Sequence, residues 1–256
     1  MRDPHVECIH YEVGTGPGIS FGNPPPLTFN NHLGRFDVRD GRLAVNPTDH
    51  YEDAGQARAV IDPFLRSWEI QADLDSNPGA LRFKFLHADV IDRQPAPPGA
   101  GVVLEAQAGE YLVVGESASL HITQHSYPAP PTALRTTSDV EFAYNRWRGF
   151  RAGREPLQAM AYAVLTQIQA AAGDRKRAAQ TFRISRKVLD TVGDLSSTRG
   201  DPANVRKVTP GSALQPLSGA ESTWLDQAVR SLIRRLGEHA SGALLPELTM
   251  DDLPPL

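Results

Sequence analysis

The prevailing spacing of the hydrophobic residues along this chain of 256 residues changes at the proline-rich stretch 127–131. Before it, short segments with β-branched and aromatic residues are separated by glycines and prolines, a pattern typical of β-strands. After it, apolar residues recur every three or four positions, which indicates amphipathic helices. The prolines between the two patterns cannot continue a β-ladder and favour an extended connector. The sequence therefore predicts two domains of different structural class.

The predicted fold class is α+β. We expect an N-terminal antiparallel β-rich domain with one covering helix at 1–131, followed by a C-terminal α-helical bundle at 132–242. With 40% hydrophobic residues the chain can bury a core. A proline-containing tail at 243–256 is expected to be loose or docked as an extended strand.

In the N-terminal domain, Asp40-Gly41 is a two-residue turn signal, so a hairpin is expected around it. One helix is expected from about Asp53, with a single apolar stripe. Pro63 lies inside that helix and should kink it or mark a restart, because it removes a backbone donor and clashes with the preceding turn. The stripe consists of Ala57, Val60, Ile61, Phe64, Leu65 and Trp68. Strands are expected at 8–13, 27–38, 43–45, 81–91, 101–105, 111–114 and 119–123.

Four helices are expected in the C-terminal domain. The first should begin at about Asp139, behind a capping box formed by Ser138 and Glu141. The second should begin at Pro156, where the missing amide donor costs nothing in a first turn, and end at Gly173.

The third helix of this domain is expected to run from about 174 to near 192 and to end at Gly193. A long polar loop follows. Ser218 and Glu221 form a second capping box, and the last helix behind it should end near Ala240. Helices with such connections are typical of a bundle.

Cysteine content and hydropathy exclude several protein classes. The single Cys8 excludes an internal disulfide and a cysteine zinc cluster. No apolar run approaches the roughly 20 residues that a bilayer requires, so no membrane span is expected. The first ten residues, MRDPHVECIH, lack the basic and then apolar order of a signal peptide, which favours a cytoplasmic location.

The net charge of −4 hides an asymmetry along the chain. Residues 1–137 hold 10 basic and 17 acidic side chains, whereas residues 138–242 hold 16 basic and 10 acidic ones. A basic second half permits an anionic ligand such as RNA or DNA. The alternative is that these lysines and arginines form the solvated faces of helices.

The common nucleotide-binding and serine hydrolase motifs are incomplete. The segment GTGPG at 14–18 contains a proline and precedes no helix, so it cannot cradle a phosphate at a helix N-terminus. No GxxxxGK[ST] sequence is present. The segment GES at 115–117 begins like a nucleophile elbow, but Ser119 stands where the second glycine belongs. We therefore expect no nucleotide cofactor.

The histidines do not form a metal-ligand pattern along the sequence. His121 and His125 would lie roughly 13 Å apart on a strand, which is too far for one ion. His5 and His10 are five residues apart and would lie on opposite faces of their strand, and neither has a carboxylate at ligand spacing. We therefore expect surface histidines and no metal, with a metal site as the alternative.

One pair of residues near the end of the last helix suits catalysis. Arg235 and His239 in the segment RRLGEHA are four residues apart and share a helix face at the margin of the buried stripe, whereas Arg234 points away from it. A histidine there can act as a general acid or base near neutral pH, and a guanidinium can hold a phosphate. The pair suits attack of an RNA 2′-hydroxyl on its own phosphodiester. The alternative is that both cations cap the helix C-terminus.

The arrangement of Arg234, four residues and His239 near the end of the last helix of a small bundle resembles the HEPN superfamily of ribonucleases and RNA-associated toxins. The resemblance covers at most 138–242. It implies a metal-independent active site that is shared across a homodimer. The chain departs from the pattern at Arg235, where HEPN nucleases usually have a polar, non-basic residue. Either Arg235 and His239 form the site, or the chain is a non-catalytic relative.

Further basic residues are natural phosphate contacts if this site binds RNA. Arg183, Arg186 and Lys187 are expected to share one side of the third helix of the bundle. Arg206 and Lys207 are a second pair of basic residues, in the long loop. A solvated helix face is the alternative for both groups.

The leading hypothesis from the sequence is a HEPN-like cytoplasmic protein that cleaves RNA as a toxin or defence effector. Its acidic N-terminal domain would bind a protein partner or restrain the bundle. The alternative is a non-enzymatic two-domain binding or scaffold protein, in which surfaces of opposite charge pair with one another. A third interpretation, a sandwich that binds a carbohydrate or other small ligand, depends only on strand content and Trp68.

Overall fold

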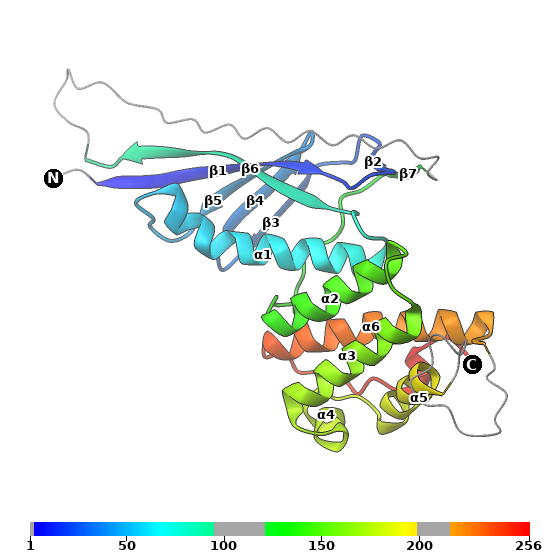
Figure 1. Ribbon diagram of the computed structural model, residues 1–256. Coiled ribbons are helices and arrows are strands. Elements are labelled where there is room, and N and C mark those ends of the chain that lie inside the picture. The colour runs from blue at the N-terminus through cyan, green and yellow to red at the C-terminus, as the bar shows by residue number, and fades with distance from the viewer. Residues whose placement is uncertain (1–2, 95–120, 199–215) are drawn as a thin grey trace. The chain divides into compact units, whose positions relative to one another are not determined.

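The computed structural model describes residues 3–94, 121–198 and 216–256 and divides into two compact units, Met1–Pro130 and Pro131–Leu256. The first unit contains an antiparallel five-stranded sheet and one long helix, and the second contains helices (Figure 1). The predicted α+β class is therefore confirmed. The division falls within the proline-rich stretch 127–131.

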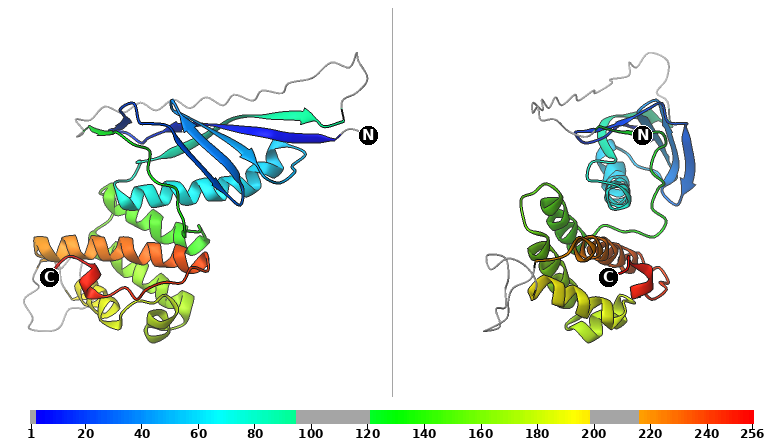
Figure 2. Two further views of the ribbon diagram at one scale, coloured as in Figure 1. Left: turned by 180° about the vertical axis from the view of Figure 1, so that it is seen from behind. Right: turned by 90° about the vertical axis from the view of Figure 1, so that its right-hand side faces the viewer.

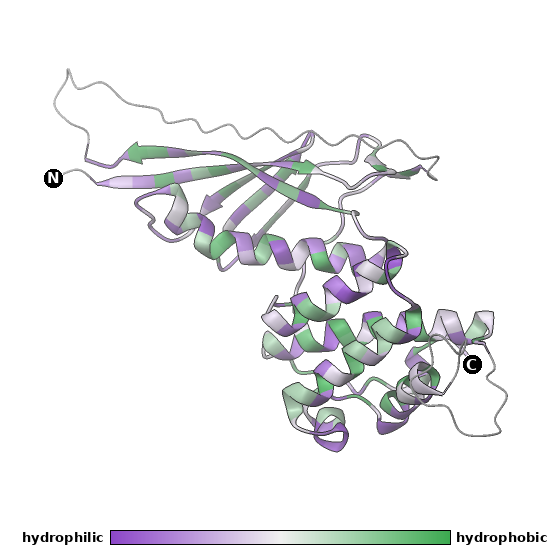
Figure 3. Ribbon diagram, in the orientation of Figure 1, coloured by the Kyte–Doolittle hydropathy of each residue, from purple (hydrophilic) through white to green (hydrophobic). Residues whose placement is uncertain are grey.

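The main sheet has the strand order β3-β4-β5-β1-β6, and each neighbouring pair is antiparallel. Its strands are β1 (Pro4–Gly14), β3 (Leu27–Asn31), β4 (Gly34–Arg39), β5 (Arg42–Pro47) and β6 (Arg82–Asp92). Two short strands, β2 (Ile19–Phe21) and β7 (Ile122–Gln124), pair in parallel beside it. Hydrophobic and hydrophilic residues alternate along the main strands, as expected for a sheet with one buried face (Figure 3).

Two tight turns set the register of β3, β4 and β5. The hairpin predicted at Asp40-Gly41 is confirmed, and both residues have the positive φ angles, 53° and 72°, that a type I′ turn requires. The strand predicted at 27–38 is instead two strands. The Asn31 side chain accepts a hydrogen bond from the Leu33 amide (2.8 Å), and this local bond turns the chain back on itself.

The helix α1 (Ala54–Asp75) covers one face of the sheet (Figures 1 and 2). It begins at Asp53, whose carboxylate accepts a hydrogen bond from the Gln56 amide (2.9 Å). Pro63 lies inside the helix but does not mark a restart, because α1 is continuous to Asp75.

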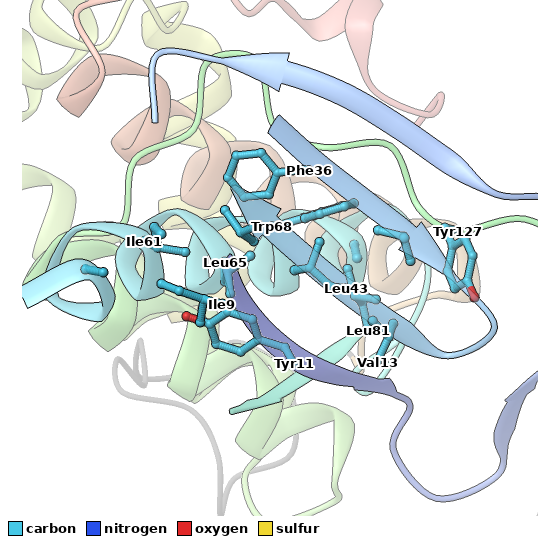
Figure 4. Packing of buried hydrophobic residues seen from close by; sticks show 14 of the residues in the cluster. Ile9, Tyr11, Val13, Phe36, Leu43, Ile61, Leu65, Trp68, Leu81 and Tyr127 are labelled. Carbon is cyan, nitrogen blue, oxygen red and sulfur yellow. The ribbon is translucent and has the colours of Figure 1, made fainter. Parts of the chain in front are cut away.

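An aromatic core fills the space between α1 and the sheet (Figure 4). Trp68 and Phe36 are fully buried there, and the Trp68 indole donates a hydrogen bond to the Pro128 carbonyl (3.0 Å). This bond ties the proline-rich stretch to α1. Of the predicted apolar stripe, only Val60 is wrong: it is 40% exposed, on the side of α1 away from the core.

The junction between α1 and β6 depends on a buried carboxylate. Asp73 has no exposed surface, and it accepts hydrogen bonds from the amides of Gly79 (2.9 Å) and Ala80 (3.0 Å). It also forms an ion pair with Arg82 (2.7 Å). One turn earlier, Glu69 accepts a hydrogen bond from the Phe83 amide at the start of β6 (2.8 Å). These bonds fix the position at which β6 enters the sheet.

The second unit is built around α3, which packs against α2, α4, α5 and α6. The helices are α2 (Ser138–Arg151), α3 (Leu157–Ala172), α4 (Arg175–Thr181), α5 (Arg186–Ser197) and α6 (Gly219–Ala240). The predicted end of α3 at Gly173 and the capping box of Ser218 and Glu221 are confirmed. The first predicted capping box is wrong by one residue, because Thr137 caps α2. Among the described helices, none is long and apolar enough to cross a membrane.

The predicted third helix is wrong, because it is broken into α4 and α5. Arg183 has φ of 52°, and Ile184 forms a parallel β-bridge with Leu248 in the tail. The Leu248 amide donates to the Arg183 carbonyl, and the Ser185 amide donates to the Leu248 carbonyl, both at 2.8 Å. Residues that pair in this extended form cannot also continue a helix. The predicted stop at Gly193 is also wrong, since α5 continues to Ser197.

The tail is docked on the helical unit. Leu248 is 5% exposed and Leu253 is 7% exposed, with the short 3-10 helix η1 (Met250–Asp252) between them. Of the two expectations for the tail, the extended docked segment is the one observed. The strands predicted at 101–105 and 111–114 lie outside the described residues.

We expect Asp73→Ala to destabilise the protein by about 3 kcal/mol, because it removes the charged acceptor that two buried amides and a partly buried guanidinium share. Urea unfolding followed by tryptophan fluorescence measures this change. Glu12→Ala, an exposed carboxylate on β1 of the same unit, is the control and should change stability by less than about 0.5 kcal/mol. Equal effects of the two variants would contradict the role given to Asp73.

Candidate functional site

His239 lies in the last turn of α6 and is exposed. Its ring contacts the Phe182 ring edge to face, with centroids 5.0 Å apart and an interplanar angle of 79°. Phe182 caps the end of α4, so this contact joins the end of α6 to the turn between α4 and α5. The imidazole is thus held on one side and open to solvent on the other.

Arg235 has less access to a ligand than the sequence suggests. Its side chain is 11% exposed and lies 3.4 Å from a Glu238 carboxylate oxygen. Hydrogen bonds from the Thr249 amide and hydroxyl, and in addition the charge of Arg235, hold the pKa of the Asp252 carboxyl below its usual range. Arg235 therefore lies among carboxylates of α6 and the tail. Arg234, on the same helix, is half-buried.

Three other cations line a groove of about 290 Å³ in the same unit. We call it the basic groove. Lys176 belongs to α4, Arg183 to the interhelical turn and Arg186 to the first turn of α5. The other lining residues are Ala179, Gln180, Ile184 and Glu247. The first turn of α5 contains no acidic residue, and Ser185 makes no side-chain cap there, so the positive end of the helix dipole adds to the charge of the groove.

The charges around the basic groove are only partly compensated. Asp190 accepts hydrogen bonds from Arg186 and Arg175, both at 3.0 Å. Burial raises the pKa of Asp190, but the hydrogen bonds and the charges of the two arginines together outweigh it, so the pKa lies below its usual range. In the part of the chain that the structure describes, no carboxylate forms an ion pair with Lys176 or Arg183. Glu247 lines the groove as well, and Asp174 acts electrostatically on Lys176, so the groove keeps an excess of positive charge but is not purely basic.

The break between α4 and α5 changes the predicted group of Arg183, Arg186 and Lys187. Arg183 does not lie one helical turn before the other two, because the chain leaves the helix at Phe182. The turn nevertheless directs Arg183 and Arg186 into one groove, whereas Lys187 does not line it. Lys176, which is not among the predicted phosphate contacts, also lines the groove. Arg206 and Lys207 lie outside the described residues.

A second group of chemically active side chains lies on the sheet of the first unit. Cys8 and His10 on β1 and Asp89 on β6 place one ligand atom each within 4.8 Å of one another. Burial, and secondly the charge of Asp89, raise the pKa of the Cys8 thiol to about 11. The sequence argument missed this group because it compared histidines along one strand and not across two.

Comparisons of the chain with protein-family models, with curated proteins and with solved structures found no significant match.

We expect Asp252→Asn to loosen the tail, because it removes the charge that accepts both Thr249 hydrogen bonds. Amide exchange of Leu248 and Thr249 should become about three to ten times faster at pH 7. Because folding lowers the pKa of Asp252, its stabilisation is present above the ordinary value of 3.8 and is lost as the pH falls through the lower folded value. Asp251→Asn is the matched control. Unchanged exchange in Asp252→Asn would contradict this cap.

Proposed function

We propose that this chain is a HEPN-like RNA-binding protein whose helical unit cleaves RNA without a metal. The observation that carries the proposal is the basic groove, in which Lys176 and Arg183 form no ion pair with a described carboxylate, in the same unit as the exposed His239. Phe182 contacts His239 and directly precedes Arg183, so the acid–base group and the phosphate-binding groups belong to one end of the unit.

The chemistry follows from these groups. His239 takes the proton from an RNA 2′-hydroxyl, and the oxygen attacks the adjacent phosphorus. The bond from phosphorus to the 5′-oxygen breaks and leaves a 2′,3′-cyclic phosphate. A second acid protonates the leaving oxygen; because the resemblance implies a site shared across a homodimer, we give this role to His239 of the other copy. The cations of the groove stabilise the charge that develops on the phosphoryl oxygens.

The surroundings of the basic residues decide the role that each has in this proposal. Lys176, Arg183 and Arg186 contact phosphates, because they line an open groove. Arg235 is the weaker phosphate ligand in the free protein, since Glu238 and the charge of Asp252 already compensate it. Arg234, the position that the resemblance favours, is half-buried on the same helix. The acidic N-terminal unit is proposed to bind a protein partner or to restrain cleavage, on the basis of the charge asymmetry alone.

RNA binding should depend on the basic groove. We expect Lys176→Ala and Arg183→Ala each to weaken binding of a labelled single-stranded RNA and to reduce the slope of log K against log salt by about 0.7. Fluorescence anisotropy at several salt concentrations measures both changes. Arg154→Ala, an exposed arginine elsewhere in the same unit, is the matched control. Unchanged affinity in the double variant of Lys176 and Arg183 would contradict this binding site.

RNA cleavage should depend on His239. In EDTA, we expect His239→Ala to lower the cleavage rate by about 100-fold or more while its circular dichroism is unchanged. His32→Ala, an exposed histidine in the other unit, should cleave as the unchanged protein does. Light scattering on the same samples tests the homodimer. If the unchanged protein binds RNA in the groove but does not cleave it, the non-catalytic binding protein is the better assignment.

A further inference from the structure

The face of the sheet opposite α1 carries an ordered group of ligand-type side chains. Ile9 and Tyr11 on β1 point into the core under α1, so Cys8 and His10, which alternate with them, point to the other face. On β6, Ala88 packs on the core side, and His87 and Asp89 flank it. One thiol, two imidazoles and one carboxylate therefore share a face.

The strand register places these four residues directly opposite one another in pairs. His10 pairs with His87, and Cys8 pairs with Asp89. The His10 Nε2 atom lies 2.9 Å from one Asp89 carboxylate oxygen, and the His87 Nε2 atom lies 3.8 Å from the other. The two imidazole rings are stacked with centroids 4.5 Å apart. These contacts bring the donor atoms much closer together than spacing along either strand does.

We propose that Cys8, His10 and Asp89 bind a Zn²⁺ ion, with His87 or water as the fourth ligand. Thiolate, imidazole and carboxylate are the ligands that zinc uses in proteins. Bond lengths of about 2.0–2.3 Å in a tetrahedron require ligand atoms about 3.3–3.8 Å apart. The donor atoms of Cys8, His10 and Asp89 already lie within 4.8 Å of one another. Side-chain rotations that move these atoms by about 1 Å would bring them to the distances that zinc requires.

The pairing of the two strands that carry these residues is irregular, and this observation is independent of the side-chain distances. The pairing of β1 with β6 shifts between Val6 and Cys8 and again between His10 and Tyr11, so two bulges flank the Cys8–His10 stretch. Bulges bend a strand and redirect its side chains, and they are frequent beside functional sites. Here they frame the residues that carry the donor atoms.

An open groove beside the cluster provides access for an ion. The groove has a volume of about 780 Å³, and His10 forms part of its wall. Its other lining residues come from β4 and β5 and the turn between them: Arg35, Asp37, Arg39, Asp40, Arg42, Ala44 and Asn46. A zinc ion at the cluster would therefore have solvent on one side, where a water molecule can complete its coordination.

Cobalt binding tests this proposal directly, because a Co²⁺–thiolate bond produces a charge-transfer band and Cys8 is the only cysteine in the chain. Untagged, metal-free protein should develop this band with an end point at one Co²⁺ per chain, and Zn²⁺ should abolish it. Cys8→Ser should lose the band. Asp89→Asn and His10→Gln should each weaken Co²⁺ binding by at least about tenfold.

Glu12→Gln and His32→Ala are the matched controls, because they remove an exposed carboxylate on β1 and an exposed imidazole, both outside the cluster and the groove. Both should bind Co²⁺ as the unchanged protein does. Absence of the band in the unchanged protein would overturn the proposal, and so would equal affinity in Asp89→Asn and His10→Gln. If Cys8→Ser fails to fold by circular dichroism, those two variants decide. None of these outcomes depends on RNA binding.

Discussion

The packing of α1 on a single face of the sheet is the constraint on which the first unit depends. Trp68, Phe36 and their aromatic neighbours fill that side, so every second residue of β1, β4 and β5 must turn to the other face. The register between neighbouring strands then determines which residues lie side by side on the face away from α1. The burial of one face therefore also fixes which polar residues are neighbours on the opposite face. The proposed zinc ligands are a consequence of this order, together with the two bulges in β1 and β6.

In the helical unit, a corresponding constraint comes from the tail. Leu248 pairs with the backbone on both sides of Ile184, and this pairing holds Arg183 in a left-handed conformation between α4 and α5. On a single continuous helix, Lys176, Arg183 and Arg186 would lie within about 80° of one another but would be spread over about 15 Å of its length. The break instead gathers them around one groove, at the positive end of α5. The basic groove thus depends on the contact of Ile184 with Leu248, which is 64 positions further along the chain.

Local signals in the sequence predicted the parts of the fold that local forces determine. The Asp40-Gly41 hairpin, the cap of α6 and the stop of α3 at Gly173 each follow from one or two residues and their backbone preferences. The break after Phe182 has no such signal, because its cause is the distant Leu248. The candidate sites divide in the same way. His239 follows from helical spacing, whereas the group of Cys8, His10 and Asp89 needs the register between β1 and β6, which alternation within each strand restricts but does not determine.

The surroundings of the two cations at the end of α6 argue for different roles. Arg235 lies 3.4 Å from Glu238 and acts electrostatically on Asp252. Its position is therefore explained by stability without any ligand. His239 has a different environment, because its described ring contact is with the uncharged Phe182 ring and the residue is exposed. An exposed imidazole without a described carboxylate partner needs another reason for its place than an ion pair, which is why the acid–base role in the proposed reaction falls to His239 and the phosphate contacts to the groove.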